Sequence, residues 1–457
     1  MDIIAAISTG NAATAIGIVR ISGEGCFALC DRVFRPVKGA FSEKPPRMMV
    51  YGDIVDAEGQ LLDRALAVRF PGPGSFTGED CAEFHCHGSP VVLRELLSAL
   101  FALGARQARP GEFTQRAFLN GRMDLTQAEA VIDLIDAETA AAARNAAAQL
   151  EGGLRRRLEP IQESLLEITS RFYAVVDYPD EDIEDIRPEE VAEALSSAET
   201  ALARLLATCQ RGRVLKSGVR TAIVGRPNVG KSSLLNALVG YDRAIVTDIA
   251  GTTRDTVEDT AVVRNVLLRL VDTAGIHETE DPVERIGVER SRAAVESADL
   301  VIAVVDGVTG PTEEDREILE LASHAPHWIL GCSKSDLLPP GFAHVIQVPG
   351  NGPDACILFS SVADGGLSAL EDSIADLFPA GEAAESGSLL TDARQEEAVR
   401  RAHGAIGRAK EALECGLTPD AILTDAEEAL EAIGELTGRT AKEEIVGRIF
   451  SRFCVGK

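Results

Sequence analysis

The stretch TAIVGRPNVGKSSLLNAL, residues 221–238, constrains the fold of this chain more than any other. An apolar run leads into Gly225, and the pattern Gly225-x4-Gly230-Lys231-Ser232 then opens an amphipathic helix. Glycines at these places let successive backbone N–H groups curl around a phosphate, and a helix N-terminus adds a favourable partial charge. The stretch therefore predicts a strand, a phosphate-binding loop and a helix in an α/β domain.

Further residues fit the handling of a nucleoside triphosphate. Lys231 is expected to reach the β- and γ-phosphates, and the Ser232 hydroxyl to ligate Mg²⁺. The apolar run VLLRLVDTAG ends in Asp272, whose carboxylate can hold the metal shell, and in Gly275, whose amide can meet the γ-phosphate. Thr253, in the intervening DIAGTTRD, can complete the metal shell in a segment that the triphosphate orders.

Two later runs indicate that the base is guanine. In WILGCSKSD a predicted strand is followed by Lys334 and Asp336. An aspartate there can accept two hydrogen bonds from guanine, which adenine could not supply. The run ILFSS would then bring Ser360 and Ser361 near the base. We therefore predict a guanine-nucleotide domain.

The pattern departs from common GTPases at two positions. Ser333 stands where GTPases usually carry Asn, and because serine is shorter the sequence leaves open whether it bridges to the phosphate loop and how it affects guanine affinity. Ile276 follows DTAG where Ras-type GTPases have a glutamine that positions water. The acidic stretch HETEDPVER is the nearest supply of a substitute, and no arginine finger is evident. Asn228 could instead help to hold a monovalent cation where such a finger acts.

Changes in sequence texture predict three domains in four segments. Short apolar runs bounded by Gly, Pro and Asp indicate an α+β domain over residues 1–120. Helical spacing dominates 121–215 and returns over 383–457, which suggests one all-α domain in two pieces. Between them, at 216–382, strands alternate with helices, as expected of an inserted α/β P-loop (Ras-like) domain.

Composition limits the environment and the partners. The chain has 457 residues, nine cysteines and a formal net charge of −27. Scattered cysteines, the lack of a roughly 20-residue apolar span and the absence of a signal-like N-terminus favour the cytoplasm. So acidic a chain needs a local basic patch, or a more basic partner, to serve a nucleic acid. Two clusters exist, at 155–157 and 211–220, which we interpret first as solvated helix faces.

The run CAEFHCHGSP raises the question of a zinc site. Cys81, His85, Cys86 and His87 are all ligand types. Successive strand residues point to opposite faces, so His85 and His87 can share a side that Cys86 cannot. No second ligand pair with zinc-like spacing follows. We predict an ordinary strand.

The two ends of the chain and the phosphate-loop region together resemble the tRNA modification GTPase family called MnmE or TrmE. The resemblance covers essentially the whole chain. It rests on GIVRISG, FTGEDCAEFHCHGSP, RPGEFTQRAFLNGRMDLTQAEAV, the phosphate-loop region and the terminal GRTAKEEIVGRIFSRFCVGK. It implies a folate-binding N-terminal domain that mediates dimerisation, a two-segment helical domain and an inserted G domain.

The resemblance also implies residue roles in GTP hydrolysis, with two G domains meeting in a homodimer. Ser232 and Thr253 would ligate Mg²⁺. Glu284 in DPVERIG would orient water indirectly, although a solvated helix carboxylate is the alternative. K⁺ would be held by Asn228, Thr247, Ile249 and Thr252. GTP would be contacted by Asn228, Gly230, Lys231, Ser232, Ser233, Thr247, Thr252, Thr253, Asp272, Gly275, Lys334, Asp336, Ser360 and Ser361.

The reaction that the resemblance implies joins GTP hydrolysis to one-carbon chemistry. With the FAD-dependent partner MnmG (GidA), in a heterotetramer or larger complex, the family installs an aminomethyl or carboxymethylaminomethyl group at C5 of the wobble uridine of certain tRNAs. The carbon comes from 5-formyl- or 5,10-methylene-tetrahydrofolate. Folate contacts would come from Arg20, Glu83, Arg122 and Lys457. A carboxylate for the pterin edge and cations for the glutamate tail suit this role, although surface ion pairs are the alternative.

The terminal CVGK matches the family's C-[ILV]-G-K signature. Gly456 would permit a close backbone approach, and Lys457 would bring an ammonium toward the pterin. Cys454 could be a nucleophile or an acid/base near the transferable carbon, and we count it with Lys231 and Glu284 as catalytic. The alternative is a small core residue that packs after Phe453.

Two other functions compete with the tRNA-modifying enzyme. A regulatory or ribosome-assembly GTPase would use the nucleotide only as a switch, but such proteins usually append an RNA-binding module or a second G domain. Neither a GxxG-type clamp nor a repeated phosphate loop is evident in the sequence. A membrane-remodelling GTPase would need an apolar anchor, and we expect no stable membrane insertion.

Overall fold

The computed structural model describes residues 2–10, 12–177, 187–241, 259–271, 294–339, 350–379 and 387–457. They form two compact units, each taken by itself below. The first unit comprises Met1–Ile132, Leu150–Ser196 and Arg401–Lys457, and the second comprises Asp133–Gln149 and Ser197–Arg400.

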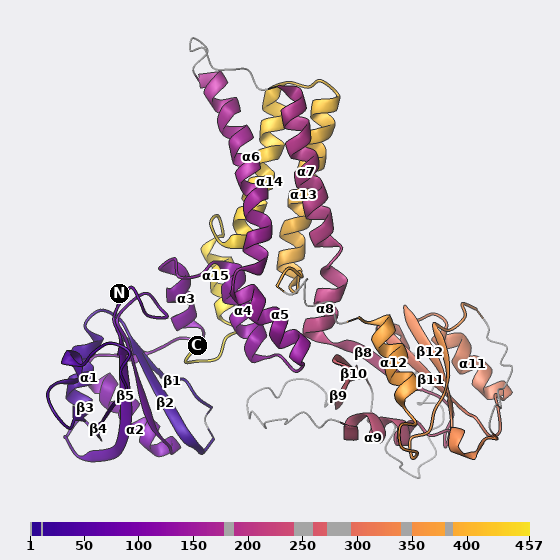
Figure 1. Cartoon of the computed structure of the whole chain (residues 1–457), viewed down its shortest axis with the longest axis horizontal. Helices are drawn as coiled ribbons and strands as arrows, with labels where there is room; N and C mark the ends of the chain where they lie inside the picture. The colour runs from indigo at the N-terminus through magenta and orange to yellow at the C-terminus, as the bar shows by residue number, and fades with distance from the viewer. Residues whose placement is uncertain are drawn as a thin grey trace. The chain divides into compact units, whose positions relative to one another are not determined.

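The first unit begins with a seven-stranded sheet in the order β3-β4-β5-β6-β2-β1-β7. Its strands are β1 (Ile4–Ile7), β2 (Thr14–Ser22), β3 (Phe34–Pro36), β4 (Val50–Val55), β5 (Leu61–Phe70), β6 (Cys81–Gly88) and β7 (Arg106–Gln107). Neighbours are antiparallel except β1 and β7, which are parallel. Helices α1 (Cys26–Val33) and α2 (Pro90–Ala102) contribute to the apolar core beneath it (Figure 1).

Strand β6 shows how the alternating sequence positions side chains. Ala82, Phe84 and Cys86 are buried in the core of the domain. Glu83, His85 and His87 alternate with them and are more exposed. The predicted strand and its alternation are confirmed, because Cys86 lies on the face opposite to the two histidines.

Helices complete the first unit: α3 (Glu112–Leu119), α4 (Leu125–Ile135), α6 (Gly153–Asp177), α14 (Pro419–Thr437), α15 (Glu443–Phe450), and parts of α7 (Pro188–Leu206) and α13 (Ala393–Glu414). α6 and α14 run alongside each other (Figure 1), with a hydrogen bond of 2.5 Å from the Tyr173 hydroxyl to Glu427. Residues Leu125, Val446 and Phe450 belong to one apolar cluster that joins α4 to α15. Among the helices that the structure describes, none is long and apolar enough to cross a membrane.

The second unit contains a six-stranded sheet in the order β13-β12-β11-β8-β10-β9. Its strands are β8 (Val219–Val224), β9 (Asp259–Val263), β10 (Val266–Leu270), β11 (Leu300–Asp306), β12 (His327–Ser333) and β13 (Ala355–Leu358). All pairs are parallel except β9 with β10. Every residue of β11 is buried, as expected of a parallel strand covered on both faces.

Helices cover both faces of this sheet. α9 (Lys231–Tyr241) and α12 (Ser368–Leu377) contribute to one apolar cluster, and α11 (Glu313–Ala322) contributes to the other. α5 (Ala140–Leu150), most of α7, and α8 (Cys209–Ser217) precede the sheet along the chain. The expected fold class is confirmed: an N-terminal α+β domain, a helical domain and an α/β domain with a phosphate-loop strand at its centre.

Candidate functional site

The phosphate loop follows β8, at the carboxyl edge of the parallel strands, where open α/β sheets bind ligands. Gly225 is required by packing, because a Cβ there would come 2.4 Å from the Val304 carbonyl oxygen. Asn228, exposed in the loop, has a φ of 62°, and Gly230 has a φ of 105°. Helix α9 then begins at Lys231. The predicted order of strand, loop and helix is confirmed.

Lys231 lies across this loop. Its Nζ donates to the carbonyl oxygens of Gly225 and Arg226, each at 2.7 Å. Burial lowers the pKa of the Lys231 ammonium. Arg226 in turn donates to Asp315 of α11 at 2.8 Å, and Asp315 also accepts the Thr312 backbone N–H at 2.8 Å in a capping box. The loop is therefore fixed at both its start and its end.

Ser333, at the end of β12, bridges to the loop. Its side-chain hydroxyl lies 2.5 Å from the Val229 carbonyl oxygen and 3.2 Å from that of Val305. The residue is 3% exposed. The bridge that the sequence left open is therefore present, because the strand end lies so close to the loop that a serine spans the gap.

Lys334 and Asp306 form an ion pair beside the loop. Lys334 Nζ lies 2.6 Å from Asp306 Oδ2, and the backbone N–H of Val308 donates to Asp306 Oδ1 at 2.8 Å. Burial raises the pKa of Asp306, but the Lys334 hydrogen bond and backbone N–H groups outweigh it and lower the pKa. Asp306 therefore holds Lys334 while it stays ionised.

Asp336 and Ser360, two of the residues predicted to lie near the base, contact each other. The Ser360 hydroxyl donates to Asp336 Oδ1 at 2.7 Å. Ser360 Oγ also accepts the Ala363 backbone N–H at 3.2 Å, which orders the turn containing Ser361. One carboxylate oxygen of the exposed Asp336 is thus oriented by a buried serine.

The structure brings together the nucleotide candidates that follow the ends of β8, β12 and β13: Asn228, Gly230, Lys231, Ser232, Ser233, Lys334, Asp336, Ser360 and Ser361. The remaining candidates lie outside the described residues. They are Thr247, Ile249, Thr252, Thr253, Asp272, Gly275 and Glu284.

A second cluster lies on the N-terminal sheet of the first unit. Arg20 of β2 faces Glu83 of β6 across the ladder, with Nη2 and Oε1 2.9 Å apart. The guanidinium carbon of Arg20 lies 5.6 Å from the ring centroid of Phe76 and 5.6 Å from that of Phe113. His85 Nε2 lies 3.3 Å from the other Glu83 oxygen. Sequence reasoning missed both rings and His85, although FTGEDCAEFHCHGSP contains two of the three.

The C-terminal tail docks on the same N-terminal domain. The backbone N–H of Gly111 donates to the Cys454 carbonyl oxygen at 3.3 Å, and the backbone N–H of Phe113 donates to the Lys457 carbonyl oxygen at 3.2 Å. The Ser8 hydroxyl donates to the Gly456 carbonyl at 3.0 Å. Lys457 is therefore linked through Phe113 to the ring that lies beside Arg20.

Gly456 is required by this docking. Its φ is 99°, and a Cβ on it would come 2.2 Å from the Ile7 carbonyl oxygen. Cys454 is exposed, whereas Phe450 and Phe453 are buried. The alternative of Cys454 as a small core residue is therefore wrong. The residue that packs is its neighbour Phe453.

Arg122 lies next to a loop of the same domain. It is exposed, and a Cβ built on Gly78 would come 3.3 Å from Arg122 Cγ. Arg122 therefore lies against the loop that contains Phe76, which contacts Arg20. No hydrogen bond between Arg122 and Arg20 or Glu83 is present among the described residues.

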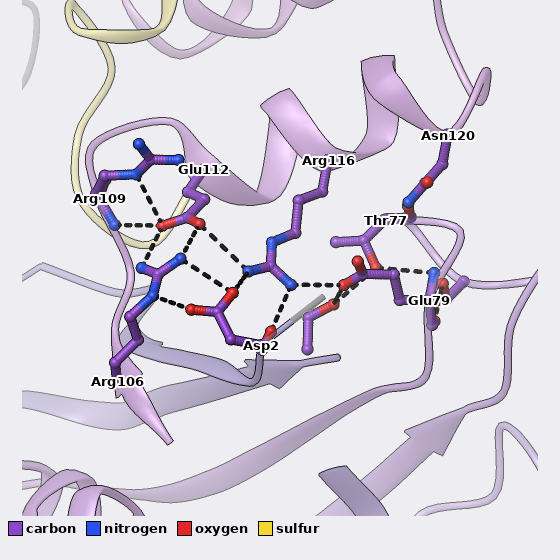
Figure 2. A network of polar contacts seen from close by, with 10 residues as sticks. Asp2, Thr77, Glu79, Arg106, Arg109, Glu112, Arg116 and Asn120 are labelled. Atoms are coloured by element: carbon purple, nitrogen blue, oxygen red, sulfur yellow. Dashed lines mark hydrogen bonds and ion pairs between the residues drawn. The ribbon is translucent and has the colours of Figure 1, made fainter. Parts of the chain in front are cut away.

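An ionic network centred on buried Arg116 and Glu112 of α3 joins this helix to the start of the chain (Figure 2). Arg116 is 4% exposed and bonds Glu112 at 3.2 Å, Glu79 at 3.0 Å and Asp2 at 2.9 Å. Arg106 also bonds Glu112, at 2.5 Å. Burial raises the pKa of the Glu112 carboxyl, but its bonds to Arg106, the Arg109 backbone and Arg116 outweigh this and lower the pKa to about 2.

Known proteins resemble the chain over its whole length. Residues 3–122 match the family described as GTP-binding protein TrmE N-terminus, and residues 125–454 match the MnmE helical domain. The tRNA modification GTPase MnmE of Roseiflexus sp. (strain RS-1) is 44% identical, covering 100% of this chain and 99% of that protein. That of Acetivibrio thermocellus is 42% identical over the same shares.

Among solved structures, the G domain of the FeoB protein of T. maritima is 27% identical, with a TM-score of 0.24, over 35% of this chain and 97% of that one. The full-length relatives and the two family models name the same family, and the two models together span residues 3–122 and 125–454. The chain belongs to the MnmE (TrmE) family of tRNA modification GTPases.

Proposed function

We propose that the chain is a K⁺-activated GTPase that, with an FAD-dependent partner (MnmG/GidA), installs an aminomethyl or carboxymethylaminomethyl group at C5 of the wobble uridine of certain tRNAs. A tetrahydrofolate derivative supplies the carbon. The main support is that the terminal CVGK docks on the domain that carries the Arg20–Glu83 pair, where Lys457 accepts a hydrogen bond from the backbone of Phe113, whose ring lies beside Arg20. A regulatory GTPase without one-carbon chemistry gives no reason for this docking.

The nucleotide site supports the GTPase part. Lys231 would bind the β- and γ-phosphates, and Asp336, oriented by Ser360, would accept two hydrogen bonds from guanine. Mg²⁺ would be held by Ser232 with Thr253 and Asp272, and when bound it neutralises phosphate charge. Glu284 would orient the attacking water indirectly.

K⁺ would be held by Asn228 with Thr247, Ile249 and Thr252. In support, Asn228 is exposed in the loop, and its φ of 62° lies in the left-handed region that asparagine tolerates better than most residues. A carboxamide oxygen is a ligand type that hard cations accept. The cation would act where other GTPases place an arginine.

The cluster around Arg20 supports folate as the one-carbon carrier. Glu83 offers a carboxylate for the amide-like pterin edge, and the rings of Phe76 and Phe113 offer flat apolar surfaces. Arg20, Arg122 and Lys457 would bind anionic parts of the ligand. Exposed Cys454 would act at the transferable carbon, as a nucleophile if it is deprotonated.

Family membership also supports the proposed partners, which are a second copy of the chain, the FAD-dependent protein and tRNA in the cytoplasm. 5-Formyl-tetrahydrofolate would serve as the stable probe for folate binding, and 5,10-methylene-tetrahydrofolate is the other candidate donor.

Isothermal titration with 5-formyl-tetrahydrofolate tests the proposal. Wild type should bind, and Arg20→Ala should lose at least about tenfold in affinity, since it removes a half-buried charged contact. Arg64→Ala is the matched control, because Arg64 is an exposed arginine of the same sheet that pairs with Asp53. Absence of binding by wild type would favour the switch without one-carbon chemistry.

A further inference from the structure

A pocket of about 680 Å³ lies in the first unit, where α3, α6, α14 and α15 meet. Ligand pockets typically have volumes of about 300–1,000 Å³. Its wall combines the apolar side chains of Phe118, Met123 and Val446 with the side-chain amides of Gln115 and Gln162. Such a wall offers a flat apolar surface for a base and hydrogen-bonding groups for the edge of that base.

Two guanidinium groups also line the pocket. Arg439, which follows α14, is exposed and takes part in no ion pair among the described residues. Arg155, in the first turn of α6, is about half exposed and lies 3.5 Å from Glu159, also about half exposed. An exposed pair of this kind is weak and can exchange Glu159 for another anion. Both arginines are therefore available to phosphate groups.

More cations flank these two in the sequence. Arg156 and Arg157 continue the exposed run on α6, and the tail segment after Gly438 adds Lys442 and Arg448, both exposed. Three carboxylates, Asp124, Glu159 and Glu443, also line the pocket, so the site is no general trap for anions. The chain carries a net charge of −27, so most of its surface repels a polyanion. A local concentration of arginines is what such a chain needs to bind RNA.

We propose that this pocket takes one unstacked nucleotide of the tRNA substrate, with Arg155 and Arg439 on the flanking phosphates and Phe118 beside the base. The inference rests on the proposed function, in which tRNA is the substrate. It adds a place for the RNA on this chain. Gly121 lines the pocket and is followed by Arg122, the proposed folate contact. An RNA segment held here would therefore pass close to the proposed one-carbon site.

The test measures binding of a fluorescein-labelled, unmodified tRNA transcript with a wobble uridine, by anisotropy in about 50–200 mM KCl. The full-length double variant Arg155→Glu/Arg439→Glu should bind at least about tenfold more weakly, and its log–log salt slope should fall by about 1.4, since each phosphate contact on a single strand contributes about 0.7. The control, Arg187→Glu/Arg316→Glu, changes the net charge equally at two exposed arginines elsewhere, and should stay within about threefold of wild type.

A second variant tests the pocket apart from charge. Gln115→Trp projects a bulky ring into the pocket from partly exposed α3 and should also weaken tRNA binding at least about tenfold. Thermal melting and GTP affinity check that each variant is folded. The proposed RNA site would be refuted if Arg155→Glu/Arg439→Glu or Gln115→Trp bound tRNA as tightly as wild type, or if the control lost as much affinity. Either result would still allow tRNA to be a substrate. If wild type bound no tRNA even with the FAD-dependent partner present, both the proposed RNA site and the proposed tRNA substrate would be refuted.

Discussion

The bridge from Ser333 to the phosphate loop predicts that Ser333→Ala weakens nucleotide binding. The hydroxyl is buried and lies 2.5 Å from the Val229 carbonyl oxygen. Removing it deletes one buried hydrogen bond, worth about 0.5–1.5 kcal/mol, and leaves a buried carbonyl without that donor. The loop would then sample more conformations before it binds phosphate, and binding would bear the cost of ordering it.

A loss of about 1 kcal/mol corresponds to a roughly fivefold increase in Kd. The increase should be the same for GTP and GDP, because the bridge holds the loop and does not touch the γ-phosphate. Ser333→Asn places the usual GTPase residue at this position. It should retain more affinity than Ser333→Ala if the buried site accepts the larger side chain.

Fluorescent GDP and GTP analogues provide the assay, and Ser323→Ala provides the control. Ser323 is also buried in the second unit, where it caps the C-terminus of α11, and its hydroxyl donates to the Glu320 carbonyl in the last turn of that helix at 2.7 Å. Both variants lose a similar hydrogen bond, but only Ser333→Ala should lose affinity. Wild-type affinity in Ser333→Ala, with a stability loss equal to that of Ser323→Ala, would refute the reasoning.

Three further predictions follow from the two sites. Gly456→Ala should lower folate affinity by at least about tenfold in calorimetry, because the tail cannot dock with a Cβ 2.2 Å from the Ile7 carbonyl; unchanged affinity would contradict this role. Folding lowers the pKa of Glu112 from 4.5 to about 2, so the ionised carboxylate stabilises the folded state fully above pH 4.5, and this stabilisation is lost as pH falls toward 2. The free energy of unfolding should therefore fall by on the order of 3 kcal/mol over that pH range. Glu112→Gln should remove this pH dependence from the free energies measured by urea unfolding, and a variant that keeps the wild-type pH dependence would contradict the prediction. GTP turnover should be much faster in K⁺ than in Na⁺, and Asn228→Ala should abolish the difference. Equal wild-type rates in the two salts would refute activation by K⁺.

The local parts of the fold follow from the sequence for clear reasons. Two glycines specify the phosphate loop. A Cβ on Gly225 would clash with the Val304 carbonyl oxygen, and Gly230 needs a positive φ. The face alternation of β6 follows from the period of two in a strand. In each case the constraint lies within a few residues of the motif.

Long-range placement could not be predicted in the same way. The length of Ser333 says nothing about the distance to Val229, which depends on how closely β12 approaches the loop. Arg116 and Glu112 are an ordinary i,i+4 pair in the sequence, but Asp2, which also pairs with Arg116, is more than a hundred residues away. The docking of Gly456 on Ser8 is likewise a tertiary contact that helix and strand periods do not encode.

The central claim is that one enzyme combines the nucleotide site and the N-terminal one-carbon site. Mass spectrometry of wobble nucleosides from a deletion strain, complemented with wild type, Lys231→Ala or Arg20→Ala, tests it most directly. The account predicts that C5 aminomethyl-type uridines vanish in the deletion strain, return with wild type, and return with neither variant. Undiminished modified uridine in the deletion strain, or full rescue by Arg20→Ala, would contradict it.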